Sequence, residues 1–241
     1  MNIAAAVNRK IDRIPTGRIF GYEEIPEYRD SPDAVLRAVC RLVDRGRLRR
    51  LRRGRFYKAT RGILGEMRPG DTELLKDALY RNGRRIGYIT GPALYNRMGL
   101  TTQSPKTITI ASKRVPQTND FGTIRIKFVP SRAPVSESTI ELQEILDALR
   151  DAKNVPDASV ETVINALADR LTKLGVADLR KLQKLAVEYY NAATRALLGL
   201  LMTTNEQPVL SMLRDSINPS TRFSISINPD EWPQARDWNI R

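Results

Sequence analysis

Residues 31–58 constrain the fold more than any other part of this chain. The segment combines the start and stop signals of a helix with a very basic composition: between positions 37 and 58, ten residues are Lys or Arg and one is acidic. Ser31 is a good N-cap residue, and Pro32 suits the first helical position after it. Gly46 can end the helix, because glycine readily adopts the left-handed conformation found there. The segment is therefore predicted to begin with a short helix that carries much of this charge.

This helix is predicted to be amphipathic. Its apolar residues recur at the spacing of one helical face, namely Val35, Val39, Leu42 and Val43. With about 100° between successive residues, Arg37 and Arg41 point away from that face, and Arg45 lies beside them. The apolar face is expected to pack on a core, which leaves the arginines exposed.

A β-hairpin is predicted directly after the helix. Arg50-Leu51-Arg52 and Arg55-Phe56-Tyr57 flank the two-residue turn Arg53-Gly54. In that register Leu51 faces Phe56, so the apolar pair can pack inward while the arginines point outward. Upstream, residues 3–14 have helical apolar spacing, residues 18–20 can pair with the hairpin, and residues 22–28 suit a short helical segment. This element order predicts a winged helix-turn-helix over residues 1–60.

The charge of the chain is unevenly distributed. Residues 1–58 contain 15 Lys and Arg against 7 Asp and Glu, and the remainder contains 25 against 20, within a formal charge of +13. The excess predicts that the N-terminal part faces a polyanion. The alternative is a solvated basic face that binds nothing.

The predicted helix and hairpin assign roles to the arginines. Arg37 and Arg41 are expected to read base edges in double-stranded DNA, because a guanidinium matches guanine O6 and N7. The others are expected to contact phosphates or the minor groove: Arg45, Arg47, Arg49, Arg50, Arg52, Arg53 and Arg55.

Composition argues against several other classes of protein. The chain has no histidine and one cysteine, Cys40, which excludes an internal disulfide and removes the usual metal ligands and acid–base catalyst. There is no Gly-rich phosphate loop, and Asp71 and Glu73 stand at a helix start, where acids serve as caps. We therefore expect no catalytic residue, metal or cofactor. No apolar run reaches the roughly 18 residues of a membrane span, so no membrane partner and a cytoplasmic location are expected.

Residues 61–241 are predicted to form a second domain, which makes the fold class α+β. A glycine-rich stretch at 61–70 marks the boundary, residues 71–135 mix helix and strand signals, and residues 136–203 carry helical apolar stripes. Residues 204–241 form a tail with a possible strand at 223–227, and Trp232 and Trp238 predict that it docks on the body. The fold is thus a winged helix-turn-helix, a mixed α/β domain and a largely helical C-terminal part.

A second set of basic residues could gather on one side of the middle domain. Its members are Arg81, Arg84, Arg85, Arg97, Lys106, Lys113 and Arg114. Such a patch could contact RNA, nucleotide or additional DNA, and the alternative is ordinary solvated surface.

Several motifs together resemble AbiEi-type antitoxins. Three lie in the predicted winged helix: Gly17–Phe20, Ala38–Gly46 and Arg50–Tyr57. Further matches follow at Thr90–Pro105, Arg195–Gly199 and Leu213–Pro219. The resemblance implies a type IV toxin–antitoxin role in phage defence, in which the antitoxin represses its own operon through the winged helix. It also implies that the C-terminal domain counters a nucleotidyltransferase-like toxin without forming a stable complex.

The operator is expected to be an inverted repeat bound by two copies of the protein, as is common for repressors. Two alternatives remain from the residues themselves. One is a plain winged-helix transcription factor whose second domain senses a ligand or dimerises. The other is an RNA-binding module, which would need aromatic stacking surfaces.

Overall fold

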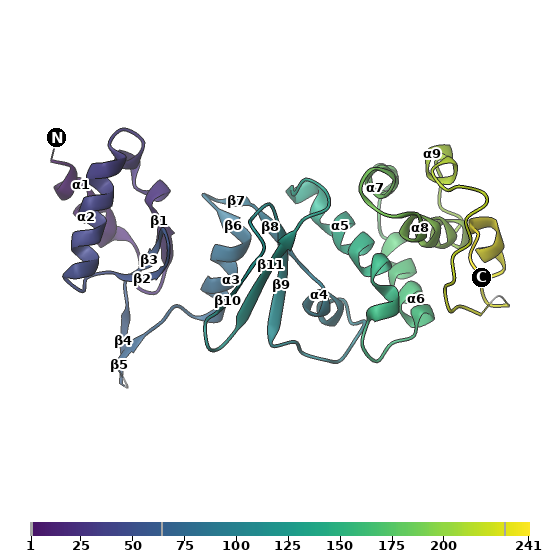
Figure 1. Cartoon of the computed structure of the whole chain (residues 1–241), viewed down its shortest axis with the longest axis horizontal. Helices are drawn as coiled ribbons and strands as arrows, with labels where there is room; N and C mark the ends of the chain where they lie inside the picture. The colour runs from purple at the N-terminus through teal and green to yellow at the C-terminus, as the bar shows by residue number, and fades with distance from the viewer. Residues whose placement is uncertain (1, 64, 229) are drawn as a thin grey trace. The chain divides into compact units, whose positions relative to one another are not determined.

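The computed structural model describes residues 2–63, 65–228 and 230–241, and the chain divides into two compact units, Met1–Arg84 and Arg85–Arg241 (Figure 1). The fold class is α+β, as predicted. The expected domain boundary at residues 60 and 61 is wrong, because the glycine-rich stretch and the helix after it belong to the first unit.

The first unit begins with a winged helix-turn-helix. Its elements are α1 (Ile3–Arg13), β1 (Ile19–Gly21), the 3-10 turns η1 (Tyr22–Glu24) and η2 (Pro26–Tyr28), α2 (Pro32–Asp44), β2 (Arg49–Arg52) and β3 (Arg55–Tyr57). The strands form an antiparallel sheet in the order β1-β3-β2. The sheet and the helices share one buried hydrophobic core, which includes Val7, Ile11, Phe20, Val39 and Phe56. The predicted pairing of residues 18–20 with the hairpin is confirmed in β1.

The register of the hairpin differs from the prediction. Arg50 lies opposite Phe56, Arg52 lies opposite Arg55, and the register shifts between them. The expected pairing of Leu51 with Phe56 is therefore wrong. A bulge at this place leaves Leu51 half-buried and puts the Arg50 guanidinium 5.7 Å from the centre of the Phe56 ring.

A second hairpin and a helix complete the first unit. The hairpin consists of β4 (Thr60–Gly62) and β5 (Gly65–Met67), and it lies in the glycine-rich stretch that was expected to mark the domain boundary. Helix α3 (Asp71–Leu79) follows, and its Glu73 accepts a hydrogen bond from the backbone N–H of Ile19 in β1 at 2.9 Å. This bond joins α3 to the winged-helix sheet. The chain then passes through β6 (Tyr80–Arg81) and β7 (Arg84–Arg85), where the first unit ends.

The second unit contains a mixed four-stranded sheet. Its elements are β8 (Gly87–Thr90), α4 (Pro92–Arg97), β9 (Thr107–Ser112), β10 (Gln117–Asp120) and β11 (Arg125–Pro130). The order is β10-β11-β9-β8, with β9 and β11 parallel and the other pairs antiparallel. Strand β10 consists of polar residues only. It lies at the sheet edge and is mostly exposed, so its sequence has no apolar alternation to reveal it.

Helices make up most of the rest of the second unit. They are α5 (Glu137–Arg150), η3 (Ala152–Asn154), α6 (Val160–Leu171), α7 (Val176–Tyr189), α8 (Ala192–Thr204), α9 (Ser211–Asp215) and η4 (Pro233–Trp238). The possible strand at 223–227 is wrong, because Phe223 makes only a single bridge, to Ile240. Docking of the tail is confirmed: Trp232 and Trp238 are buried in the same core as α5 to α8.

A buried polar cluster connects α5 to its neighbours. Asp147, 1% exposed, accepts hydrogen bonds from the hydroxyls of Tyr88 (3.0 Å), Thr90 (2.7 Å) and Tyr190 (3.0 Å). It also pairs with Arg150 at 2.8 Å. A buried carboxylate with this many donors is well satisfied, so the cluster fixes how β8 packs on α5. In the described part of the chain, no helix is both long enough and apolar enough to span a bilayer.

Candidate nucleic-acid interface

Helix α2 has one buried face and one exposed face. Val35, Ala38, Val39 and Leu42 are buried against the core of the first unit. The helix ends at Asp44, and Gly46 follows at the C′ position with a φ of +72°, which favours glycine. There the N–H groups of Gly46 and Arg47 donate to the carbonyls of Val43 and Leu42, both at 2.9 Å. This Schellman pattern turns the chain at once into the hairpin, so that helix and hairpin are held next to each other.

Three arginines line the exposed face of α2. Arg37, Arg41 and Arg45 follow one another at four-residue intervals and are all exposed. Four residues rise about 6 Å along a helix, so the series covers a length similar to a few base pairs. Within residues 2–63, 65–228 and 230–241, the side chains of these three form no ion pair or hydrogen bond. Their charge is therefore available to a ligand.

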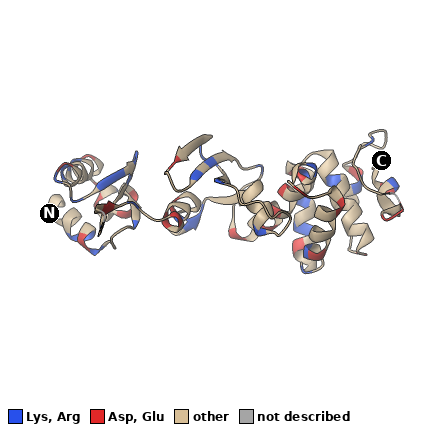
Figure 2. Cartoon of the chain, turned by 90° about the horizontal axis from the view of Figure 1, so that it is seen from below, with Lys and Arg blue, Asp and Glu red and all other residues tan. Residues whose placement is uncertain are grey.

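Two arginines of the hairpin add to this surface. Arg53 is exposed in the turn between β2 and β3 and has no ion-pair partner among the described residues. Arg50 reaches toward α2, with Nη2 4.0 Å from the Sγ of Cys40. Figure 2 shows a strand of the N-terminal unit coloured blue along most of its length, in agreement with the sequence of β2. We call Arg37, Arg41, Arg45, Arg50 and Arg53 the open arginines.

Two other predicted contact residues are held in exposed ion pairs. Arg47 lies 2.6 Å from Asp12 and donates to Asn8 at 2.7 Å, both in α1. Arg49 binds both carboxylate oxygens of Glu66 at 2.8 Å, and these hydrogen bonds hold the pKa of Glu66 below its usual range. Exposed pairs of this kind contribute little free energy, so a phosphate can compete for either arginine.

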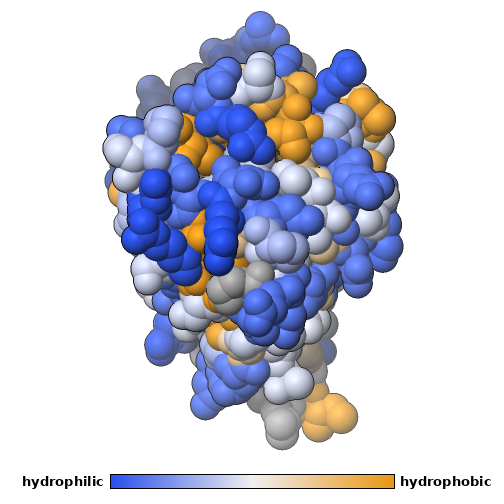
Figure 3. All heavy atoms as spheres, turned by 90° about the vertical axis from the view of Figure 1, so that its right-hand side faces the viewer, coloured by the Kyte–Doolittle hydropathy of each residue, from blue (hydrophilic) through white to orange (hydrophobic). Residues whose placement is uncertain are grey.

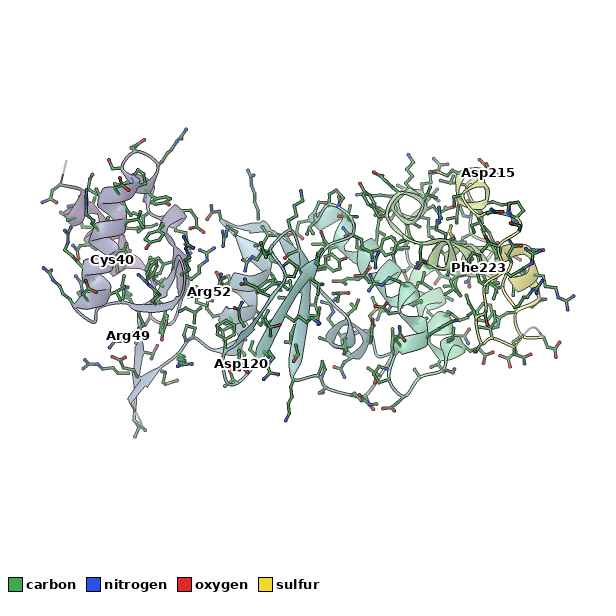
Figure 4. The ribbon with its side chains drawn as sticks, in the orientation of Figure 1. Cys40, Arg49, Arg52, Asp120, Asp215 and Phe223 are labelled. Carbon is green, nitrogen blue, oxygen red and sulfur yellow. The ribbon has the colours of Figure 1, made fainter. Side chains whose placement is uncertain are left out.

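The structure corrects the expectation for Arg55. Its side chain is buried, 4% exposed, and pairs with Glu23 at 2.7 Å and with Asp77 at 3.0 Å. A guanidinium in this position is not available to DNA. Arg52, which is labelled in Figure 4, is half-buried and lies 2.5 Å from the same Asp77, so it too is tied to α3. These pairs could not be predicted from the sequence, because the acidic partners are remote along the chain.

The second basic group is divided between the two units. Arg81 and Arg84 belong to the first unit and the other members to the second. Arg97 is paired with Glu144 at 2.7 Å, Arg85 donates to the carbonyl of Gly87, and Arg114 lies over the Phe128 ring. Lys106 and Lys113 flank opposite ends of β9, a strand of six residues, and their Cα atoms are about 23 Å apart by strand geometry. The five members in the second unit therefore do not gather into one compact patch within that unit.

No cluster suited to a metal is found: among the described residues, no group of three or more Cys, Asp and Glu side chains could hold an ion.

The sequence profile of a family of unknown function (DUF6088) matches residues 6–174. A search of curated proteins and a search of solved structures each returned no match. The matched residues include the winged helix from residue 6 of α1 onward, the mixed sheet and helices α5 and α6.

Proposed function

Because the chain belongs to DUF6088, a family of unknown function, we propose its function from its own residues: a sequence-specific DNA-binding repressor of its own operon. The observation that carries the proposal is the row of Arg37, Arg41 and Arg45 on the open face of α2, which has no acidic partner among the described residues. A helix of this kind fits the major groove, and the adjoining hairpin fits phosphates or the minor groove.

The open arginines have different roles in this proposal. Arg37 and Arg41 read base edges through their guanidinium forks. Arg45, Arg50 and Arg53 neutralise phosphates. Arg47 and Arg49 also bind phosphates once they release their acidic partners, Asp12 and Glu66 respectively. Arg52 and Arg55 hold the hairpin on α3 and are left out of the interface.

The second part of the proposal concerns the whole chain. Its resemblance to AbiEi-type antitoxins supports a type IV toxin–antitoxin role in the cytoplasm. The second unit then counters a nucleotidyltransferase-like toxin without a stable complex, and two copies of the protein occupy an inverted repeat. The protein acts by binding and performs no catalysis.

DNA binding is tested by fluorescence anisotropy with the DNA upstream of the gene and with a scrambled duplex of the same length. Arg37→Ala or Arg41→Ala is expected to cost about 1–3 kcal/mol on the upstream DNA and little on the scrambled duplex. Arg180→Ala is the matched control, because Arg180 is an exposed arginine of α7 in the second unit. Equal losses on both duplexes would refute base reading.

The antitoxin role is tested by co-expression with the neighbouring nucleotidyltransferase-like gene. Growth is expected to recover with the full chain and with Arg37→Ala/Arg41→Ala, because the toxin is countered by the second unit. Absence of such a neighbour, or no recovery of growth, leaves DNA binding intact and removes the antitoxin role.

A further inference from the structure

The C-terminal segment encloses a pocket that DNA binding does not use. Its volume is about 510 Å³, and residues from 222 to 241 line it. Backbone hydrogen bonds from Phe223 to Asn239 (2.8 Å), from Ile225 to Arg241 (3.0 Å) and from Arg241 to Phe223 (2.9 Å) tie the two ends of this segment together. Pockets that bind small molecules have volumes of about 300–1,000 Å³, so this one is large enough for a small ligand.

The lining combines positive charge with an apolar wall. Arg222, Arg236 and Arg241 contribute three exposed guanidinium groups, and no described lining residue has a carboxylate side chain. Arg222 is fixed by hydrogen bonds from Nη1 to the carbonyls of Pro219 (2.5 Å) and Thr221 (3.0 Å). The wall includes the partly buried or buried residues Ile227, Trp232 and Ile240. Figure 3, which faces the C-terminal part, shows apolar surface between strongly hydrophilic side chains.

A buried donor in the wall lacks a partner. Trp232 is 4% exposed, and its indole Nε1 has no hydrogen-bond acceptor among the described residues. The other tryptophan of the segment differs, since Trp238 donates from Nε1 to Thr203 Oγ1 at 3.0 Å. Buried donors are nearly always paired. Because the Nε1 atom has less than 1 Å² of exposed surface, a ligand acceptor can reach it only if the wall of the pocket shifts on binding.

We propose that this pocket binds a nucleoside phosphate. The guanidinium groups of Arg222, Arg236 and Arg241 take the phosphate oxygens, because planar forks match their geometry. The apolar wall receives the base and sugar, and the Trp232 indole donates to an acceptor on the ligand. The site lies wholly in the second unit and contains none of the residues proposed to bind DNA. The proposal of ligand binding can therefore be correct or wrong whether or not the protein binds DNA.

Isothermal titration calorimetry of the full chain tests the proposal, with ATP, adenosine and inorganic phosphate compared at one ionic strength in EDTA. ATP is expected to bind saturably and at least about tenfold more tightly than either fragment, because each fragment keeps only part of the contacts. Arg222→Gln and Arg236→Gln should each weaken ATP by about tenfold, the typical effect of losing a charged hydrogen bond. Arg180→Gln is the matched control and should leave ATP binding unchanged.

Trp232→Phe tests the indole donor separately. This variant should bind ATP more weakly than wild type. The midpoint of its thermal unfolding should stay close to that of wild type, as expected if the segment is still folded. If the variant is unfolded, the proposal is judged from Arg222→Gln and Arg236→Gln, whose side chains are exposed. The proposal is overturned if no saturable ATP binding is seen, or if Arg180→Gln weakens it as much as Arg236→Gln. Adenosine equal to ATP would exclude phosphate recognition, and inorganic phosphate equal to ATP would exclude recognition of the nucleoside.

Discussion

Arg55 of β3 and Asp77 of α3 form an ion pair in the interior of the first unit, with Nε 3.0 Å from Oδ1 and side chains 4% and 9% exposed. Asp77 also holds Arg52 at 2.5 Å, and Arg55 also holds Glu23 at 2.7 Å. The basic hairpin therefore has two kinds of arginine. Some fix it to the helix that follows, and others, such as Arg53 in the turn, are left open to solvent.

Removal of this buried charge should destabilise the first unit. Asp77→Asn leaves Arg52 without its carboxylate and Arg55 with Glu23 alone, and breaking a buried ion pair typically costs about 3 kcal/mol. Hydrogen exchange at the amides of Phe20 and Phe56 measures the loss, because both lie in the sheet of this unit. Asp12→Asn is the control: its pair with Arg47 is exposed, so the effect should stay below about 1 kcal/mol. Equal effects of the two variants would contradict the structural role given to Asp77.

The salt dependence of DNA binding should separate the two kinds of arginine. Each phosphate contact that is lost lowers the slope of log K against log salt by about 0.9. Arg53→Ala should produce this change, because its guanidinium is open in the turn. Arg52→Ala should leave the slope almost unchanged, because Arg52 is already paired with Asp77. Identical slopes for wild type and Arg53→Ala would remove the hairpin turn from the interface.

The sequence predicted correctly those features of the fold that depend on neighbouring residues along the chain. The N-cap at Ser31 and the glycine at Gly46 placed α2 within a residue of its observed ends, and apolar spacing identified which face it buries. The bulge that moves Leu51 away from Phe56 could not be predicted, because it depends on how the hairpin packs. The same holds for Arg55, which has the same side chain as its exposed neighbours and differs only in the acids that the fold brings to it.

The docking of the C-terminal tail should be sensitive to one glycine. A Cβ on Gly199 of α8 would come within 2.3 Å of the buried ring of Trp238. Gly199→Ala should therefore displace the tail and cost about 1–3 kcal/mol, the usual effect of overpacking a core. Gly175→Ala is the matched control, because no atom lies within 4 Å of a Cβ built there. Urea unfolding followed by tryptophan fluorescence measures both, since Trp232 and Trp238 lie in the tail. A Gly199→Ala variant as stable as Gly175→Ala would contradict the close packing of Trp238.

Stability of the second unit should fall at alkaline pH because of three buried phenols. Burial, together with the charge of Asp147, raises the pKa of Tyr88 and Tyr190 well above the ordinary value. Burial and a hydrogen bond to Asp151 raise the pKa of Tyr95. In the unfolded chain these groups ionise near pH 10. The stability that they contribute is therefore fully present below about pH 10 and is lost as the pH rises further.

The size of this effect follows from the number of protons involved. Each tyrosine that is protonated when folded and ionised when unfolded lowers the free energy of unfolding by about 1.4 kcal/mol per pH unit above pH 10. Tyr190→Phe loses its hydrogen bond to Asp147, so it should be less stable than wild type at pH 8. Its stability should also fall less steeply between about pH 10 and pH 11.5, by the share of one tyrosine. Urea unfolding at a series of pH values, followed by tryptophan fluorescence, measures both slopes. If wild type and Tyr190→Phe lose stability at the same rate, the Tyr190 phenol ionises in the folded protein and its hydrogen bond to Asp147 does not hold the proton.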